Sequence, residues 1–490
     1  MNNKSQRPNL LYVFPDQFRL ASLGLWQQSD FESYHQGQSD PVFTPHLNRF
    51  AEQATILTRA VSNCPVCSPH RGSLMTANFP NKSGVPLNCH SERVCSDLPA
   101  DEHCFTDVLS EQGYHIGYIG KWHLDLPTKN DPVKPGEFVD HRRPAWDSYT
   151  EPSRRHGIDY WYGYGTFDVH NAPHYYDAQG RRHEPQQWSA EHEADKAIAY
   201  IENNHDERDA DKPFALFVSM NPPHSPYWSE ADCRKEDVAK YAHLDDDALL
   251  VRDNADRQLA KAEAARYYFA NVSGVDTEFG RIVEALKASG EWDNTLVVFT
   301  SDHGETLCSQ GIEDAKNVIF HEAYAVPFLC KLPNQHTHAI NATPLNSADI
   351  MPTVLGALGL SDAMPRGRHG RDVQLADPLS MQTTPEGTLY LRNLDGELNQ
   401  QGQVIGYFAQ SRGIRTAQHT LAIEIDQHGE LQEILFFDDS LDPYQQRNLP
   451  FDPTHAPEAH LLLLLAKELE RIDDPWHQLQ ILPQLFPDIR

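Results

Sequence analysis

The stretch Leu10-Leu11-Tyr12-Val13-Phe14-Pro15-Asp16-Gln17 leads from a β-prone apolar run directly into a carboxylate and an amide side chain. Three later segments have the same form: His115–Ile119 before Lys121-Trp122-His123, Phe214–Val218 before Asn221-Pro222-Pro223-His224, and Leu296–Phe299 before Thr300-Ser301-Asp302-His303. Short apolar runs without alternation are typical of strands buried on both faces, as in a parallel sheet. The sequence therefore predicts four such strands, each ending in polar residues.

Helical patterns separate these predicted strands, at Thr44–Gln53, Phe105–Gln112, Ala190–Asn203 and Ala260–Gly290. Strands that alternate with helices indicate an α/β fold, in which a large, mostly parallel sheet is sandwiched between helices. Ligands of such folds bind at the carboxyl ends of the strands. Because titratable residues follow four strand ends in this chain, we expect a functional site where those ends converge.

After about residue 375 the sequence no longer alternates between predicted strands and helices. Thr388–Arg392, Gly402–Arg412, Thr420–Ile425 and Glu433–Phe437 read as antiparallel strands, and His460–Ile472 reads as an amphipathic helix. We therefore expect a catalytic α/β domain over residues 1–375 and a smaller α+β subdomain over 376–490, with the boundary in the Arg366–Asp377 loop.

Composition narrows the possible partners of the chain. The 490 residues carry a formal net charge of −29, which argues against nucleic-acid binding because that needs a basic face. An anionic substrate would need cations gathered locally. No apolar stretch is long enough to span a membrane, and the polar segment before Asn9 lacks the apolar core of a signal peptide. We expect a cytoplasmic protein, or a periplasmic one if a leader has been removed, with its eight cysteines largely reduced.

The segment Cys64-Pro-Val-Cys67-Ser-Pro-His-Arg71 carries the most specific motif of the chain. A redox pair or half of a zinc site would be alternative readings of Cys64 and Cys67, but neither a thioredoxin-like unit nor a second ligand pair accompanies them. Cys67-x-Pro-x-Arg71 followed by Leu74-x-Thr76 resembles the modification motif of formylglycine-dependent sulfatases, which belong to the alkaline phosphatase superfamily. The strand-end motifs occur in that family's order.

This resemblance implies that Cys67 is oxidised to formylglycine by a formylglycine-generating or anaerobic sulfatase-maturating enzyme. One hydroxyl of the aldehyde hydrate would attack sulfur, and the other would later expel sulfate. We expect Cys67 just before a helix that starts near Arg71, where free N–H groups favour an anion. Arg71 would then hold the hydrate and a sulfate oxygen.

The resemblance also implies a metal site at Asp16, Gln17, Asp302 and His303, in contact with residue 67. Carboxylate and amide oxygens with one imidazole suit a divalent ion, and the oxygen-rich set favours Ca²⁺ over Mg²⁺. Gln17 and His303 stand where many relatives have Asp and Asn, which leaves the identity of the metal open.

Four further residues match catalytic positions of the family. Lys121 resembles the cation that binds sulfate, and His123 the base that deprotonates the hydrate. His224 resembles the general acid that protonates the leaving alcohol. Lys316, eleven residues before Pro327, resembles a second lysine that binds sulfate and the bridging oxygen.

The aromatic and histidine-rich segment Asn130–His183 suits contacts with a sugar, and we expect His170, His174, Arg142 and Arg143 to contact the substrate. The predicted activity is hydrolysis of a sulfate ester on a sugar or short oligosaccharide, with attack at a chain end. Alternatives are a phosphonate or phosphate ester hydrolase of the same fold, a sulfatase of choline-sulfate type, and a non-catalytic carbohydrate-binding protein. The oligomeric state stays open.

Overall fold

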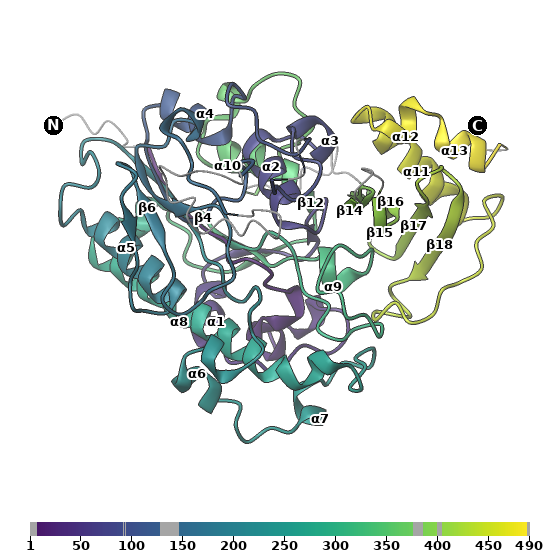
Figure 1. Ribbon diagram of the computed structural model, residues 1–490, viewed down its shortest axis with the longest axis horizontal. Helices are drawn as coiled ribbons and strands as arrows, with labels where there is room; N and C mark the ends of the chain where they lie inside the picture. Colours follow the sequence, from purple (N-terminus) through teal and green to yellow (C-terminus); the bar gives the residue numbers. More distant parts are fainter. Residues whose placement is uncertain are drawn as a thin grey trace.

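The computed structural model describes residues 7–91, 93, 95–127, 147–375, 386–398 and 404–487. These form two main sheets with their own helices, and two sheets of two strands each (Figure 1). Within these residues the larger sheet has ten strands, in an order that differs from the order along the chain. From edge to edge they are β11 (Ala339–Asn341), β2 (Thr55–Leu57), β10 (Phe328–Lys331), β9 (Thr295–Thr300), β1 (Asn9–Val13), β8 (Phe214–Ser219), β4 (His115–Lys121), β5 (Tyr160–Tyr164), β6 (Tyr175–Asp177) and β7 (Arg182–His183).

The four strands predicted from sequence are neighbours in the middle of this sheet. β1 pairs in parallel with β9 and with β8, and β8 pairs in parallel with β4, so all four carboxyl ends lie along one edge. β10 runs antiparallel to both β9 and β2, and β6 and β7 also pair in antiparallel fashion. The predicted mixed, mostly parallel sheet is confirmed.

Helices cover both faces of the sheet, so each central strand is buried on both sides. Leu11 and Val13 of β1 pack into one core with α1 (Pro45–Ala51), α5 (Ser189–Glu202) and α8 (Ala265–Ala288). Leu10 and Tyr12 pack into the other, with α2 (Cys67–Thr76), α4 (Phe105–Glu111) and α10 (Ile350–Ala357). Shorter elements complete this part of the chain: α3 (Pro80–Ser83), α6 (Lys235–Ala239), α7 (Asp246–Leu249), α9 (His321–Tyr324), β3 (Ala60–Val61) and β12 (Leu345–Asn346).

The second sheet, seen on the right of Figure 1, is antiparallel, in the order β13 (Thr388–Arg392), β16 (Gln410–Arg415), β17 (His419–Ile425) and β18 (Leu431–Asp438). Leucines of α11 (Glu458–Arg471) pack on it, followed by α12 (Pro475–Gln478) and α13 (Ile481–Leu485). Cys64 and Val66 share this core with Leu389 and Leu391. The second sheet therefore supports the chain that leads into Cys67.

The prediction of one strand over Gly402–Arg412 was wrong. Two strands lie there: β15 (Val404–Phe408), which within the described residues pairs only with β14 (Asp395–Leu398), and β16, which joins the larger antiparallel sheet. Both have strand-forming sequences, and the change of partner between them depends on hydrogen bonds to distant residues. The predicted domain boundary falls where residues 376–385 lie outside the described part, so that boundary stays a prediction.

No helix in the described ranges combines the length and the apolar character that crossing a membrane requires.

Candidate active site

The modification motif occupies the first turn of α2. Cys67 is the first helical residue, preceded by Val66 in an extended conformation, and the His70 N–H donates to the Val66 carbonyl at 3.1 Å. The expected helix start near Arg71 was therefore wrong by one turn. Pro69 is compatible with this earlier start because a proline in the first turn removes no hydrogen bond of the helix. Residue 67 thus lies at the positive end of the helix dipole.

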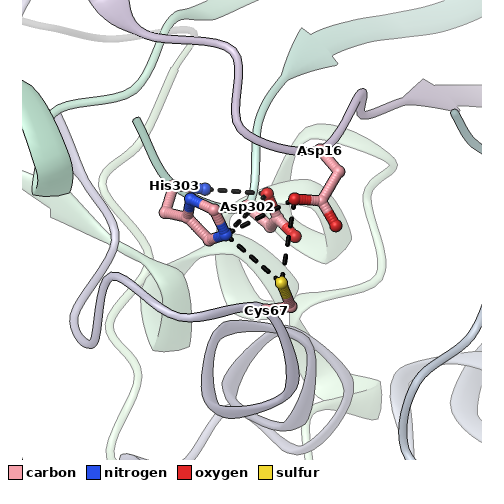
Figure 2. Close-up of side chains that lie close together, drawn as sticks. All are labelled: Asp16, Cys67, Asp302 and His303. Atoms are coloured by element: carbon pink, nitrogen blue, oxygen red, sulfur yellow. Dashed lines mark hydrogen bonds and ion pairs between the residues drawn. The ribbon is translucent and has the colours of Figure 1, made fainter. Parts of the chain in front are cut away.

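Four buried side chains, from the ends of β1 and β9 and from α2, lie close together around residue 67 (Figure 2). Potential ligand atoms of Asp16, Cys67, Asp302 and His303 all lie within 4.8 Å of one another. The Cys67 Sγ is 3.4 Å from His303 Nε2 and 3.8 Å from Asp16 Oδ1. His303 Nε2 is 3.4 Å from Asp16 Oδ1. Apart from Gln17, the cluster contains every residue that the sequence assigned to the metal site.

The hydrogen bonds around this cluster fit a bound divalent ion. His303 Nδ1–H donates to the Gly304 carbonyl at 2.9 Å, which leaves the Nε2 lone pair directed into the cluster. Asp302 Oδ1 accepts from the backbone N–H of Gln17 at 3.0 Å and of His303 at 2.9 Å, so that carboxylate is held in place. Two carboxylates and one imidazole are hard and borderline ligands, a set that suits Ca²⁺ or Mg²⁺.

Gln17 follows Asp16 and contributes through its amide. Its Nε2 donates to Glu305, while its buried Oε1 has no hydrogen-bond partner within the described ranges. Glu305 also accepts from Tyr227 at 2.8 Å and Lys261 at 3.2 Å, and Lys261 is chief among the groups that keep its pKa low against the effect of burial. Glu305 was missed from sequence, although it stands only three residues after Asp302. It orients the Gln17 amide, whose oxygen is left available to a metal ion.

Two buried cations pair with the carboxylates of the cluster. Arg71 Nη2 lies 3.2 Å from Asp16 Oδ2 and 3.0 Å from Asp302 Oδ2, while Arg71 Nη1 donates to Ser219 Oγ at 2.7 Å. Lys121 Nζ is 2.6 Å from Asp16 Oδ2 and 3.8 Å from Cys67 Sγ. Ser219, the last residue of β8, was not anticipated. It fixes the guanidinium one helical turn away from residue 67.

A third cation near Cys67 is Lys316, which lies far from it in the sequence. Its Nζ is 3.0 Å from Cys67 Sγ. Burial alone would raise the pKa of the Cys67 thiol, but the charges of Lys121, Lys316 and His303 hold it well below its usual value. The position of residue 67 therefore favours negative charge strongly, although the chain as a whole is acidic.

Two histidines flank residue 67 in different hydrogen-bonding states. His123 Nε2–H donates to the Cys89 carbonyl at 3.1 Å, so Nδ1 is the acceptor nitrogen, and a side-chain hydrogen bond joins His123 to Cys67. His224 Nδ1–H donates to the Ser225 carbonyl at 2.8 Å, and its Nε2 lies 2.7 Å from Lys316 Nζ. One imidazole can thus take a proton at residue 67, and the other can exchange a proton beside Lys316.

Of the four residues expected to bind substrate, the structure describes two histidines, and these have different hydrogen-bond partners. His170 is buried, donates from Nδ1–H to the Asp232 carbonyl at 3.2 Å, and has its pKa lowered to about 4 by burial. Its neighbour Asp168 lies 3.6 Å from His224 Nδ1. His174 pairs with Asp147 Oδ2 at 2.7 Å and stacks on Phe167. Arg142 and Arg143 lie outside the described residues.

Comparison with known proteins finds sulfatases that match most of the chain. The family model described as Sulfatase matches residues 8–360. The chain is 47% identical over 487 residues to an Endo-4-O-sulfatase of Bacteroides thetaiotaomicron, covering 99% of this chain and 96% of that one. It is 32% identical to an Ulvan-active sulfatase of Formosa agariphila, covering 90% and 77%.

A solved structure supports this relationship in three dimensions. It comes from work on the metabolism of multiple glycosaminoglycans by Bacteroides thetaiotaomicron, is 47% identical, and superposes with a TM-score of 0.94 over 98% of this chain and 100% of that one. Its agreement includes the antiparallel C-terminal sheet, because nearly the whole chain is covered. The chain belongs to the sulfatase family of sulfuric ester hydrolases.

Proposed function

We propose that this sulfatase removes a sulfate ester from a sulfated glycan, with formylglycine at position 67 and Ca²⁺ held by Asp16, Gln17, Asp302 and His303. The observation that carries the proposal is the position of Cys67, at a helix N-terminus, between a carboxylate–imidazole cluster and the amines of Lys121 and Lys316. When present, the formylglycine supplies a hydroxyl nucleophile and the metal ion supplies positive charge.

The cations of the chain bind the sulfate group. Lys121 and Lys316 reach residue 67 at 3.8 and 3.0 Å, so they lie where the oxygens of a sulfate held against that residue would be. Arg71 is fixed by Ser219 and the two aspartates, and lies one turn further along α2. Fixed donors aimed at spread negative charge stabilise the transition state more than mobile water does.

His224 and Lys316 act on the leaving oxygen. With Nδ1 committed to the Ser225 carbonyl, His224 exchanges a proton at Nε2, which lies 2.7 Å from Lys316 Nζ. Lys316 in turn lies 3.0 Å from residue 67. The bridging ester oxygen would therefore be held by the ammonium of Lys316 and protonated by His224 as the bond to sulfur breaks.

His123 acts on the residue 67 side of the sulfate. Its Nε2–H is held by the Cys89 carbonyl, and burial lowers the pKa of its imidazole, which keeps it neutral. Nδ1 can therefore accept a proton from a hydroxyl at position 67 when sulfate is released. The two histidines divide the proton transfers, His224 on the sugar side and His123 on the enzyme side.

The substrate proposal rests on the relatives. Proteins that are similar to this chain along most of its length have names that point to a substrate. One name gives a 4-O position, one gives ulvan, and the solved structure comes from work on glycosaminoglycans. We infer a 4-O-sulfated sugar unit within a glycan as the substrate. The relative's name specifies endo action, whereas the sequence led us to expect attack at a chain end.

A panel of disaccharides and longer oligosaccharides, each sulfated at one defined hydroxyl, tests this proposal. Turnover confined to 4-O-sulfated sugars supports it, and a preference for another hydroxyl contradicts the position. Turnover that rises with chain length supports internal attack, while equal turnover of disaccharide and polymer ends supports the chain-end expectation. Metal content of the purified enzyme distinguishes Ca²⁺ from Mg²⁺, and cell fractionation tests the predicted cytoplasmic location.

A further inference from the structure

A cavity of about 260 Å³ lies between the two sheets, away from Cys67. Its walls come from the segment 33–36, the turn between β2 and β3, the start of β13 and the end of β16. Thr388 lines it, whereas Arg392, at the other end of β13, donates to the carbonyl of Asn317, next to Lys316. Thr388 and Arg392 are four residues apart on β13, which at roughly 3.4 Å per strand residue is about 14 Å along the strand.

The residues that line this cavity are basic or neutral, whereas the chain as a whole is acidic. Asp and Glu make up 70 of the 490 residues, yet no acidic residue is among the described residues of the wall. The wall instead combines two arginines, two histidines and several hydroxyl or amide side chains: Arg59, Arg415, His35, His321, Ser33, Tyr34, Gln36, Thr58, Thr388 and Thr416. Cations with hydroxyl donors and no carboxylate form an environment for an anion.

Arg59 lacks a carboxylate partner among the described residues. Its guanidinium donates only to backbone carbonyls, of Ala342 at 3.4 Å and of Glu386 at 3.2 Å. Burial, and then the charge of Arg415, lower the pKa of Arg59 to about 10. The two guanidiniums therefore repel each other across a space that no acidic side chain fills.

Arg415 is only partly neutralised. Its Nη2 donates to Gln36 Oε1 at 2.9 Å, and its Nε lies 3.7 Å from Asp439, a carboxylate that already accepts from Thr420 and Gln445. Its Nη1 is buried without any hydrogen-bond acceptor in the described part of the chain, and the buried His35 Nε2 has no hydrogen-bond partner there either. Unpaired buried donors are costly, so a group that accepts from them is expected to bind favourably.

We propose that this cavity is a second binding site for a sulfate-type oxyanion, distinct from the catalytic centre. The ligand is either free sulfate or the sulfate group of a glycan, and both present the same tetrahedral set of acceptor oxygens to Arg59 and Arg415. The hydroxyls of Ser33, Thr58 and Thr388 line the remaining space and suit the hydroxyls of an attached sugar. The inference is independent of the catalytic proposal because it uses none of the residues near Cys67.

The test compares the wild-type enzyme with Arg59→Met/Arg415→Met, which keeps apolar stems and removes both charges. Arg447→Met, at an exposed position, is the matched control. Melting temperature is measured against inorganic sulfate and against a sulfated oligosaccharide, at constant ionic strength. Ligand that binds only the folded state raises Tm. We expect the double variant to lose about half of the wild-type rise, the remainder coming from the catalytic centre, and Arg447→Met to keep all of it.

The two ligands separate the two sources of the oxyanion. If the rise in Tm with inorganic sulfate differs between the wild type and the double variant, the site binds the free ion. If the rise in Tm differs only with the oligosaccharide, the site binds the glycan. Equal rises in both proteins with both ligands overturn the proposal. Turnover of nitrophenyl sulfate should stay within about two-fold of wild type, which separates this result from any failure of the catalytic proposal.

Crystals of the wild-type enzyme soaked in selenate give a test that does not depend on folding of a variant. An anomalous peak between Arg59 and Arg415 supports the site. Its absence, in crystals whose catalytic centre is filled with selenate, overturns it.

Discussion

Replacement of His224 by alanine tests the proposed division of proton transfer most directly. The imidazole Nε2 lies 2.7 Å from Lys316 Nζ, which lies 3.0 Å from Cys67 Sγ. In the proposed mechanism, the bridging oxygen of the sulfate ester would lie between these two side chains. The backbone N–H of His224 also donates to the Asp16 carbonyl at 3.1 Å, a contact that alanine keeps. The substitution therefore removes the proton donor while it leaves the loop anchored.

The size of the loss depends on the leaving group. Proton donation by a positioned side chain contributes about 10²- to 10⁴-fold, which corresponds to about 3–5 kcal/mol of transition-state stabilisation. A sugar alkoxide is a poor leaving group and needs the whole of this contribution. Nitrophenolate leaves without a proton, so its loss should stay below about tenfold.

The assay is kcat/KM for a sulfated sugar and for nitrophenyl sulfate, measured on the wild-type enzyme, His224→Ala and the control His336→Ala. His336 is an exposed histidine outside the site, and its replacement should change neither value. Equal losses on both substrates in His224→Ala would refute the acid role, because a residue that only binds sulfate affects both esters alike.

The remaining predictions concern the nucleophile, the metal and the stability of the fold. Cys67→Ala should abolish turnover, and mass spectrometry of the active-site peptide from active wild-type enzyme should find an aldehyde there; an unmodified thiol in fully active enzyme would contradict this. Chelation should lower both activity and Tm, and Ca²⁺ should restore them better than Mg²⁺; unchanged activity after complete metal removal would exclude the ion. Arg412→Met should destabilise the C-terminal subdomain by about 3–5 kcal/mol in urea unfolding, because it strands the buried carboxylate of Asp474, which Arg412 pairs with at 2.9 Å. Burial lowers the pKa of Lys331 to about 8 from 10.5, so between these pH values the unfolded chain holds a proton that the folded chain has lost. The stability of the wild type relative to Lys331→Met should therefore rise from pH 8 to pH 10, and a falling difference in urea titrations would contradict the assignment.

The sequence was informative wherever a local pattern determines the structure. The apolar runs at Leu10–Phe14 and Leu296–Phe299 predicted adjacent buried strands because burial on both faces requires continuous apolar sequence. Since parallel strands share one carboxyl edge, the motifs after them predicted the convergence of Asp16 and Asp302. Lys316 was predicted only because its spacing from Pro327 resembles that of the family's lysine, and its Nζ lies 3.0 Å from Cys67 Sγ.

Features that depend on distant partners were not predictable in this way. Glu305 belongs to the site because it accepts a hydrogen bond from Gln17, and nothing in the sequence around it distinguishes it from an ordinary loop carboxylate. The two strands that overlap Gly402–Arg412 follow each other almost directly, and the strands they pair with lie elsewhere in the sequence. The expectation that His174 contacts substrate stays a prediction, and its pairing with Asp147 could not be anticipated from the sequence.

The burial of Cys67 has a consequence for how the active enzyme is produced. The residue is 1% exposed at the start of a wholly buried helix, so a second protein has no access to its thiol once the chain has folded. If residue 67 is converted to formylglycine as proposed above, this conversion would compete with folding, and molecules that fold first would stay inactive. The active fraction of a preparation would then record the relative rates of these two processes, and slower folding during expression should increase it.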